Sequence, residues 1–211
     1  RTGNRVHYED KFFQKRHALN AFILAECIEA KGRFLDQIIN GVFSICEESA
    51  WQLPPHNSYE GTPNFPLPDS TKPVLDLFSC ETGAILACAR YLMKAKLDGI
   101  SPFIAKRVLA ELDHRIYTPY LNQHFWWMGN GKDKMCNWTI WCTQNVLLAA
   151  FLNEDLDEEI VGKIFLKACR SVDYFLADYG EDGCCDEGAQ YYHHAGLCLS
   201  LTLEILNGIT D

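Results

Sequence analysis

Apolar residues recur every three or four positions along most of this chain, the pattern of amphipathic α-helices. It predicts seven helices, at about residues 8–31, 33–50, 73–97, 102–116, 137–152, 157–178 and 187–207. Ser101-Pro102 supplies an N-cap and a first-turn proline for the fourth of them. Alternating period-two segments bounded by turn residues are absent, so the expected fold class is all-α.

Three stretches interrupt the helical pattern. Residues 51–73 contain six of the eight prolines, residues 118–136 are rich in Trp, Gly and Asn, and residues 179–186 form a short Gly-containing break. Helices joined alternately by short turns and long loops predict stacked antiparallel hairpins, with a binding site where the long loops gather. No linker divides the chain, so we expect one domain over residues 1–211.

The composition and charge of the chain argue against two classes of function, nucleic-acid binding and membrane spanning. The chain has 211 residues and a net charge of −9, which argues against nucleic-acid binding, since that needs a basic face. No apolar run approaches the roughly 20 residues of a membrane-spanning helix, so no membrane partner is expected. The first residues of the chain lack the apolar core of a signal peptide. We also expect the chain to be a fragment of a longer protein.

Seven of the ten cysteines lie in apolar helical stretches, where free Cys packs as a small hydrophobe. Reduced thiols are therefore expected, and with them a cytoplasmic location in a bacterial cell. The vicinal pair Cys184-Cys185 has no second CxxC and no His at zinc-finger spacing. We predict no metal and no cofactor, with a plain loop as the simplest interpretation of the pair.

Tryptophan is concentrated in one region: four of the five, Trp126, Trp127, Trp138 and Trp141, fall within sixteen residues. Flat aromatic faces beside Asn, His and Tyr suit carbohydrate rings. Trp138 and Trp141 share one helical face and are more simply explained as core. For Trp126 and Trp127, the sequence leaves exposure to a groove and packing both open.

Residues 182–194 bring acid, phenol and imidazole groups to the start of the last predicted helix. Glu187 fits the first turn, where a carboxylate is favoured, so a helix cap is its simple interpretation. Tyr191 and His194 are three residues apart and share a face. A phenol beside an imidazole can move protons, but amphipathic packing explains the same spacing.

Four motifs in order, within residues 46–57 and 75–83, at Trp126-Trp127 leading to Asn137-Trp138, and within residues 182–191, resemble the heparinase II/III-like family of polysaccharide lyases. The resemblance implies a partial (α/α) toroid of stacked helix hairpins in this chain. It also implies a β-sandwich domain, which this chain does not contain. Members of the family cleave acidic poly- or oligosaccharides at a uronic acid by β-elimination.

The resemblance also implies roles for individual residues. Asn137 matches the Asn that neutralises the uronate carboxylate, and Tyr191 matches the catalytic Tyr that protonates the leaving oxygen. Substrate-binding candidates near the matched motifs are His56, Glu81, Trp126, Trp127 and His194. A further family His comes from the sandwich domain, so it has no counterpart here. Cys184-Cys185 and Cys136 depart from the family pattern and leave the substrate open.

Two other functions stay open. A glucuronyl hydrolase on a related barrel would use carboxylates, for which Asp182, Asp186 or Glu187 could serve. A non-catalytic carbohydrate-binding or assembly module would depend on Trp126 and Trp127 and not on Tyr191. An acidic protein that binds an acidic glycan needs local positive charge, and this need disfavours highly sulfated heparin as the substrate. A toroid cut short would also expose apolar helix faces, so self-association is expected.

Overall fold

The computed structural model describes residues 5–58, 65–185 and 187–208; these are mostly helical and contain no strand, which confirms the all-α prediction. The α-helices are α1 (Arg5–Glu29), α2 (Leu35–Cys46), α3 (Leu77–Ile100), α4 (Pro102–Leu112), α5 (Thr118–Asn122), α6 (Asn137–Phe151), α7 (Glu158–Ala177) and α8 (Gly188–Asn207). Two 3₁₀ turns, Pro54–His56 and Trp126–Met128, and a π-helical turn, Asp113–Tyr117, complete the described elements.

All seven predicted helices occur, with ends shifted by a few residues. The Ser101 side chain accepts a hydrogen bond from the Phe103 N–H at 3.2 Å, as expected for an N-cap. The predicted loop at 118–136 is the main difference, because the π-helical turn carries the chain from α4 into α5. Pro119 is tolerated there because it lies in the first turn of α5, where a missing N–H costs no helical bond.

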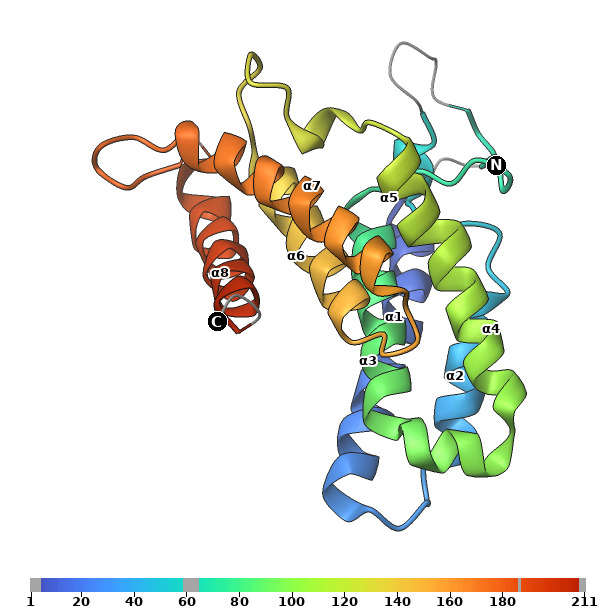
Figure 1. Ribbon diagram of the computed structural model, residues 1–211. Helices are drawn as coiled ribbons and strands as arrows, with labels where there is room; N and C mark the ends of the chain where they lie inside the picture. The colour runs from blue at the N-terminus through green and yellow to red at the C-terminus, as the bar shows by residue number, and fades with distance from the viewer. Residues whose placement is uncertain (1–4, 59–64, 186, 209–211) are drawn as a thin grey trace.

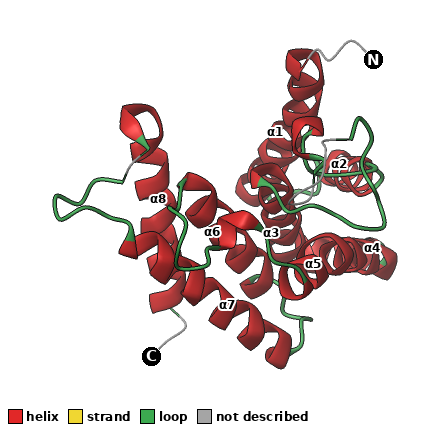
Figure 2. Ribbon diagram, turned by 90° about the horizontal axis from the view of Figure 1, so that it is seen from above, coloured by secondary structure: helices red, strands yellow, loops and turns green. Residues whose placement is uncertain are grey.

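Four long helices, α1, α3, α6 and α8, lie side by side and begin at the same end of the molecule (Figures 1 and 2). The helices α2, α4 and α7 pack against them from outside, each as the partner of the long helix before it (Figure 2). The segments 47–58, 65–76, 123–136 and 178–185 therefore gather where the four long helices begin. We call this end of the molecule the loop end.

The core fills the space between the two layers of helices. Its fully buried side chains include Leu19, Ile38, Ile45, Leu86 and Leu112. The contact between α3 and the π-helical turn is especially close, since a Cβ added to Gly83 would lie 2.7 Å from Cγ1 of Ile116. Any larger residue at position 83 would require the Ile116 side chain or the turn that carries it to shift.

A second, smaller cluster joins α6, α7 and α8. It contains Ile140, Val172, Phe175, Ala195 and Cys198. This cluster holds the middle of α8 against α6 and α7, and so fixes the helix that carries Tyr191.

All ten cysteines are free thiols in the structure, in agreement with the sequence interpretation. Burial raises the pKa of Cys46 and of Cys198 to about 11. These thiols therefore stay protonated and unreactive at neutral pH. Cys184 is exposed and Cys185 half-buried in the loop before α8.

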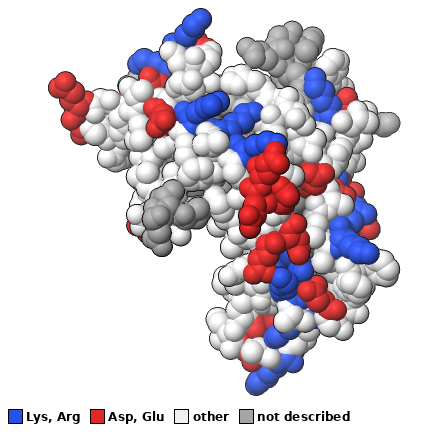
Figure 3. Space-filling view, viewed as in Figure 1, with Lys and Arg blue, Asp and Glu red and all other residues white. Residues whose placement is uncertain are grey.

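The surface carries both signs of charge. On the face drawn in Figure 3, acidic side chains gather near the middle and basic ones lie among and above them. Within the described ranges, no helix is both long and apolar enough to cross a bilayer. Leu197, Leu201 and Leu203 of α8 are exposed. Self-association through such faces stays a prediction, and a single monomeric species in light scattering across a concentration series would contradict it.

Candidate active site

The starts of α6 and α8 meet at the loop end. The carboxylate of Glu187, directly before α8, accepts a hydrogen bond from the backbone N–H of Asn137, the first residue of α6. About one turn along, the ring of His194 lies 3.8 Å from the ring of Trp141, measured between centroids. Segments fifty residues apart in the sequence therefore form one site.

Glu187 was expected to cap its own helix. Its position agrees with that expectation, but its hydrogen bond does not. It holds the N-cap position of α8, yet its side chain makes no capping bond to the N–H groups of α8. It binds instead to the first N–H of α6, which like every N–H in a first helical turn lacks a partner within its own helix. The sequence could not show this, since the partner is set by how α6 and α8 pack.

Asn137 and Tyr191 differ in exposure. Asn137 is 7% exposed, whereas Tyr191, in the first turn of α8, is 44% exposed. Within the described part of the chain, neither the Asn137 amide group nor the Tyr191 hydroxyl has a hydrogen-bond partner. The Tyr191 side chain is therefore open to a ligand at the loop end, whereas Asn137 is unpaired at its amide group but buried.

Glu81 and His194 flank Trp141 on the neighbouring helices α3 and α8. The indole Nε1–H of Trp141 donates to Glu81 Oε1 at 2.8 Å. Burial raises the pKa of Glu81, and the hydrogen bond from Trp141 opposes that rise. Burial lowers the pKa of His194, with His193 adding to the effect, and His194 Nε2 is buried with no hydrogen-bond partner among the described residues. The site thus favours a neutral imidazole.

His56 belongs to a pair that sequence reasoning did not find. Its Nδ1 lies 2.6 Å from Oδ2 of Asp76, which is fully buried. Asp76 also accepts backbone N–H bonds from Leu53, Phe78 and Ser79 and so caps α3. Because the carboxylate is an acceptor, it places the imidazole hydrogen on Nδ1 and leaves Nε2 as an acceptor in the neutral ring. The Asp76-x-x-Ser79 spacing before an apolar run could have predicted the cap of α3, but it could not have predicted that His56 pairs with Asp76.

The two adjacent tryptophans of the loop separate into different environments. Trp126 is 53% exposed, and its ring lies 5.2 Å from that of Trp138. Trp127 is 1% exposed and donates its Nε1–H to the Leu75 carbonyl at 2.9 Å. Consecutive residues of the 3₁₀ turn point in different directions, so only one of them can face outward. Trp127 is therefore a core residue, which corrects its place among the binding candidates.

Trp138 and Trp141 were interpreted as core, and they are half-buried residues that also reach the site. A continuous series of ring contacts runs from Trp141 to Phe78 at 6.2 Å, to His56 at 6.4 Å, to Trp138 at 4.9 Å and to Trp126. We call Trp141, Phe78, His56, Trp138 and Trp126 the aromatic strip. Such a strip, edged by hydrogen-bonding groups, suits the apolar faces and polar rims of sugars.

The remaining acidic candidates have structural partners or cannot be assessed. Asp182 accepts the Cys184 N–H at 3.0 Å and so orders its own loop. Asp186 lies outside the described residues. In the ranges that the structure describes, no three His, Cys, Asp or Glu side chains are grouped as metal ligands would be.

No protein-family model matches this chain, and no curated protein sequence matches it either. The site and the sequence motifs therefore carry the assignment of function.

Proposed function

We propose that this chain is the helical part of a polysaccharide lyase, a partial (α/α) toroid that acts on a uronate-containing glycan by β-elimination. The main support is the contact between the starts of α6 and α8, which brings the Asn137 and Tyr191 segments to one site. The parallel arrangement of α1, α3, α6 and α8, with α2, α4 and α7 outside, is compatible with part of a toroid.

Each step of this reaction makes a demand on the site. The Asn137 amide donates hydrogen bonds to the uronate carboxylate, which draws off negative charge and makes the C5 proton more acidic. A base removes that proton. The electron pair of the broken C5–H bond forms the C4–C5 double bond, and the C4–O4 bond breaks. The Tyr191 hydroxyl gives its proton to the departing O4. In the family resemblance the base is Tyr191 itself or a histidine from the β-sandwich domain.

The remaining side chains would hold the glycan. Trp126 offers an exposed face to a sugar ring, and His56 offers Nε2 as an acceptor beside it. Glu81 and His194 both contact Trp141 at the other end of the aromatic strip, and His194 follows Tyr191 by three residues in the sequence. A neutral His194 can donate or accept a hydrogen bond with the substrate without placing a fixed charge in the site.

The experiment follows the ultraviolet absorbance of unsaturated uronate over a panel of heparan sulfate, hyaluronan, alginate and other polyuronates. It uses this chain and a longer protein that carries the β-sandwich domain. Tyr191→Phe should abolish the rise. Tyr192→Phe is the matched control, since the two tyrosines are adjacent and equally exposed, at 44% and 45%.

The other outcomes separate the rival functions. Absence of unsaturated product from every polymer, with binding still measurable, would support the carbohydrate-binding module. Product without unsaturation, lost on Glu187→Gln, would support the hydrolase. Equal activity of the Tyr191→Phe and Tyr192→Phe variants would show that Tyr191 takes no part in the reaction.

A further inference from the structure

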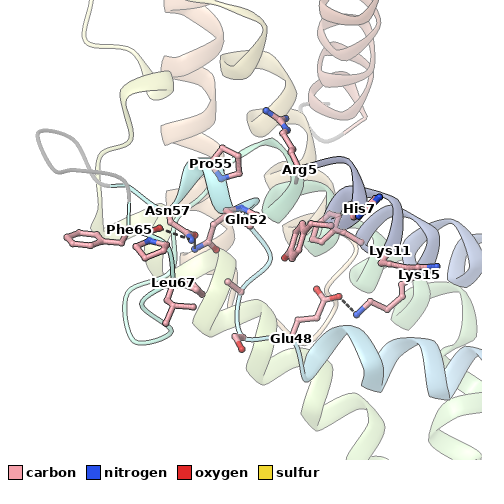
Figure 4. A pocket seen from close by; sticks show the side chains of 17 residues that line it. Arg5, His7, Lys11, Lys15, Glu48, Gln52, Pro55, Asn57, Phe65 and Leu67 are labelled. Carbon is pink, nitrogen blue, oxygen red and sulfur yellow. Dashed lines mark hydrogen bonds and ion pairs between the residues drawn. The ribbon is translucent and has the colours of Figure 1, made fainter. Parts of the chain in front are cut away.

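A groove of about 1080 Å³ lies between the first turns of α1 and the loop before α3 (Figure 4). Ligand pockets in proteins have volumes of roughly 300–1,000 Å³, so this groove is large enough for an oligosaccharide. Arg5, Tyr8 and Lys11 line it from α1, and Pro55 and Phe65 line it from the loop. We call it the α1 groove.

Rings and prolines are eight of the seventeen residues that line the α1 groove. The Tyr8 ring stacks on Phe12 at 6.0 Å, and Phe65 is 52% exposed on the opposite wall. Asn57 supports that wall, because its side chain donates to the Phe65 carbonyl at 3.4 Å and accepts from Gln52 at 3.1 Å (Figure 4). Exposed rings on two sides are suited to the apolar face of a pyranose.

The groove also carries a surplus of positive charge. Arg5, Lys11 and Lys15 line it together with one carboxylate, Glu48, and Arg5 is paired with Glu9 of the same helix, so the surplus rests mainly on Lys11. That carboxylate is already shared between Lys15 and Arg16. Among the described residues, the Lys11 ammonium has only the neutral Gln14 side chain as a polar partner, at 3.3 Å. On a chain with a net charge of −9, this surplus marks a place where an anion is attracted.

The α1 groove adjoins the aromatic strip. The 3₁₀ turn Pro54–His56 separates them: Pro55 lines the groove, whereas the His56 ring contacts Trp138. Phe12 continues the ring contacts from Tyr8 to Phe78 of the strip, at 6.5 Å. An extended ligand that occupied both regions would have to cross this turn.

We propose that the α1 groove is a second binding subsite for an acidic glycan, which holds a uronate unit away from the bond that is cleaved. The uronate carboxylate pairs with Lys11, and its ring packs between Tyr8 and Phe65. The inference rests on the proposed function for the identity of the glycan. The ring-lined walls and the continuity with the strip favour a sugar over an acidic peptide.

The test is titration calorimetry of the 211-residue chain with oligouronates of increasing length and with neutral gluco-oligosaccharides of the same lengths. Wild-type affinity should rise with oligouronate length as both regions are occupied. Lys11→Ala should weaken binding of the longest oligouronate about tenfold, flatten the length dependence and reduce the salt dependence. Lys106→Ala, an exposed charge on α4, is the matched control and should change nothing.

Three results would overturn the inference: no binding of any oligouronate to the wild-type chain, equal binding of neutral oligomers, or equal effects of Lys11→Ala and Lys106→Ala. An acidic peptide that binds as tightly as the oligouronate, with the same loss on Lys11→Ala, would also overturn it. Failure of the proposed function looks different. In that case no unsaturated product forms, while the Lys11-dependent binding of oligouronates persists.

Discussion

The two sides of the loop end differ in the chemistry that they offer. On the α8 side, Asn137, Tyr191 and His194 are neutral groups able to exchange hydrogen bonds or protons. On the α1 side, the groove is edged by Arg5 and Lys11 and lined by rings. In the function proposed above, an anion is attracted on the α1 side and reacts on the α8 side of this row of helices.

The two sides are also held together differently. On the α1 side, the buried guanidinium of Arg16 joins three elements, since it binds Glu48 of the loop at 2.7 Å and Thr82 of α3 at 2.7 Å. On the α8 side, the second, smaller cluster and the Glu187 bond hold α8 to α6. A charged network fixes the binding side, and a few apolar contacts fix the side proposed to react. We therefore expect changes to the two sides to affect different measurements.

The largest effect should follow a charge placed at the α8 side. Asn137→Asp replaces the proposed donor to the uronate carboxylate by an anion that repels it, so kcat/KM should fall by about 10³ or more. Initial rates of unsaturated-product formation measure this fall. Asn207→Asp adds the same charge at the exposed far end of α8 and should leave the rate unchanged. A similar loss in both variants would show that general charge, not position, matters.

The next largest effect concerns the stability of the α1 side. Arg16→Met leaves Glu48 without its buried partner and should lower the free energy of unfolding by about 3 kcal/mol. Urea denaturation measures the change. Arg33→Met removes an exposed pair with Glu29 and should cost less than about 1 kcal/mol. Equal costs would mean that the buried network does not hold the two elements together.

A smaller effect should come from the aromatic strip that joins the two sides. Trp126→Ala removes an exposed ring and should weaken glycan binding roughly tenfold with little change in unfolding. Trp127→Phe should do the reverse, since loss of the bond to the Leu75 carbonyl costs about 1–3 kcal/mol of stability. Calorimetry and thermal unfolding of both variants separate the two roles. A binding loss confined to Trp127→Phe would contradict this assignment.

The smallest effect is a pH dependence at Glu81. Burial raises its pKa in the folded state, so the folded chain binds this proton more tightly than the unfolded chain does. Stability must then fall as pH rises from the ordinary glutamate pKa to the higher folded value. Glu81→Gln keeps an oxygen for the Trp141 N–H and should lack this fall, so its stability relative to wild type grows over that range and then levels off. Parallel pH profiles of unfolding would contradict the raised pKa.

Most of the fold follows from periodicity, because helices such as α2 and α7 bury one regular face, whereas the central α6 is buried on nearly every side. The exceptions arise where geometry overrides the pattern. The π-helical turn at Asp113–Tyr117 draws part of an expected loop into helix, and nothing in its composition announces a wider turn. Trp126 and Trp127 have equal propensities, and only the direction of the 3₁₀ turn separates them. The Asp76 partner of His56 lies twenty residues away, beyond the reach of local patterns.

The 3₁₀ turn Pro54–His56 has a practical consequence for inhibitor design. A single turn separates the α1 groove from the aromatic strip, with Pro55 on one side and His56 on the other. Two weak fragments, one anionic for the groove and one flat for the strip, could be joined by a short linker over this turn. Once the first fragment is bound, the second binds at a high effective concentration, so the joined molecule can gain a factor of about 10²–10⁴ in affinity.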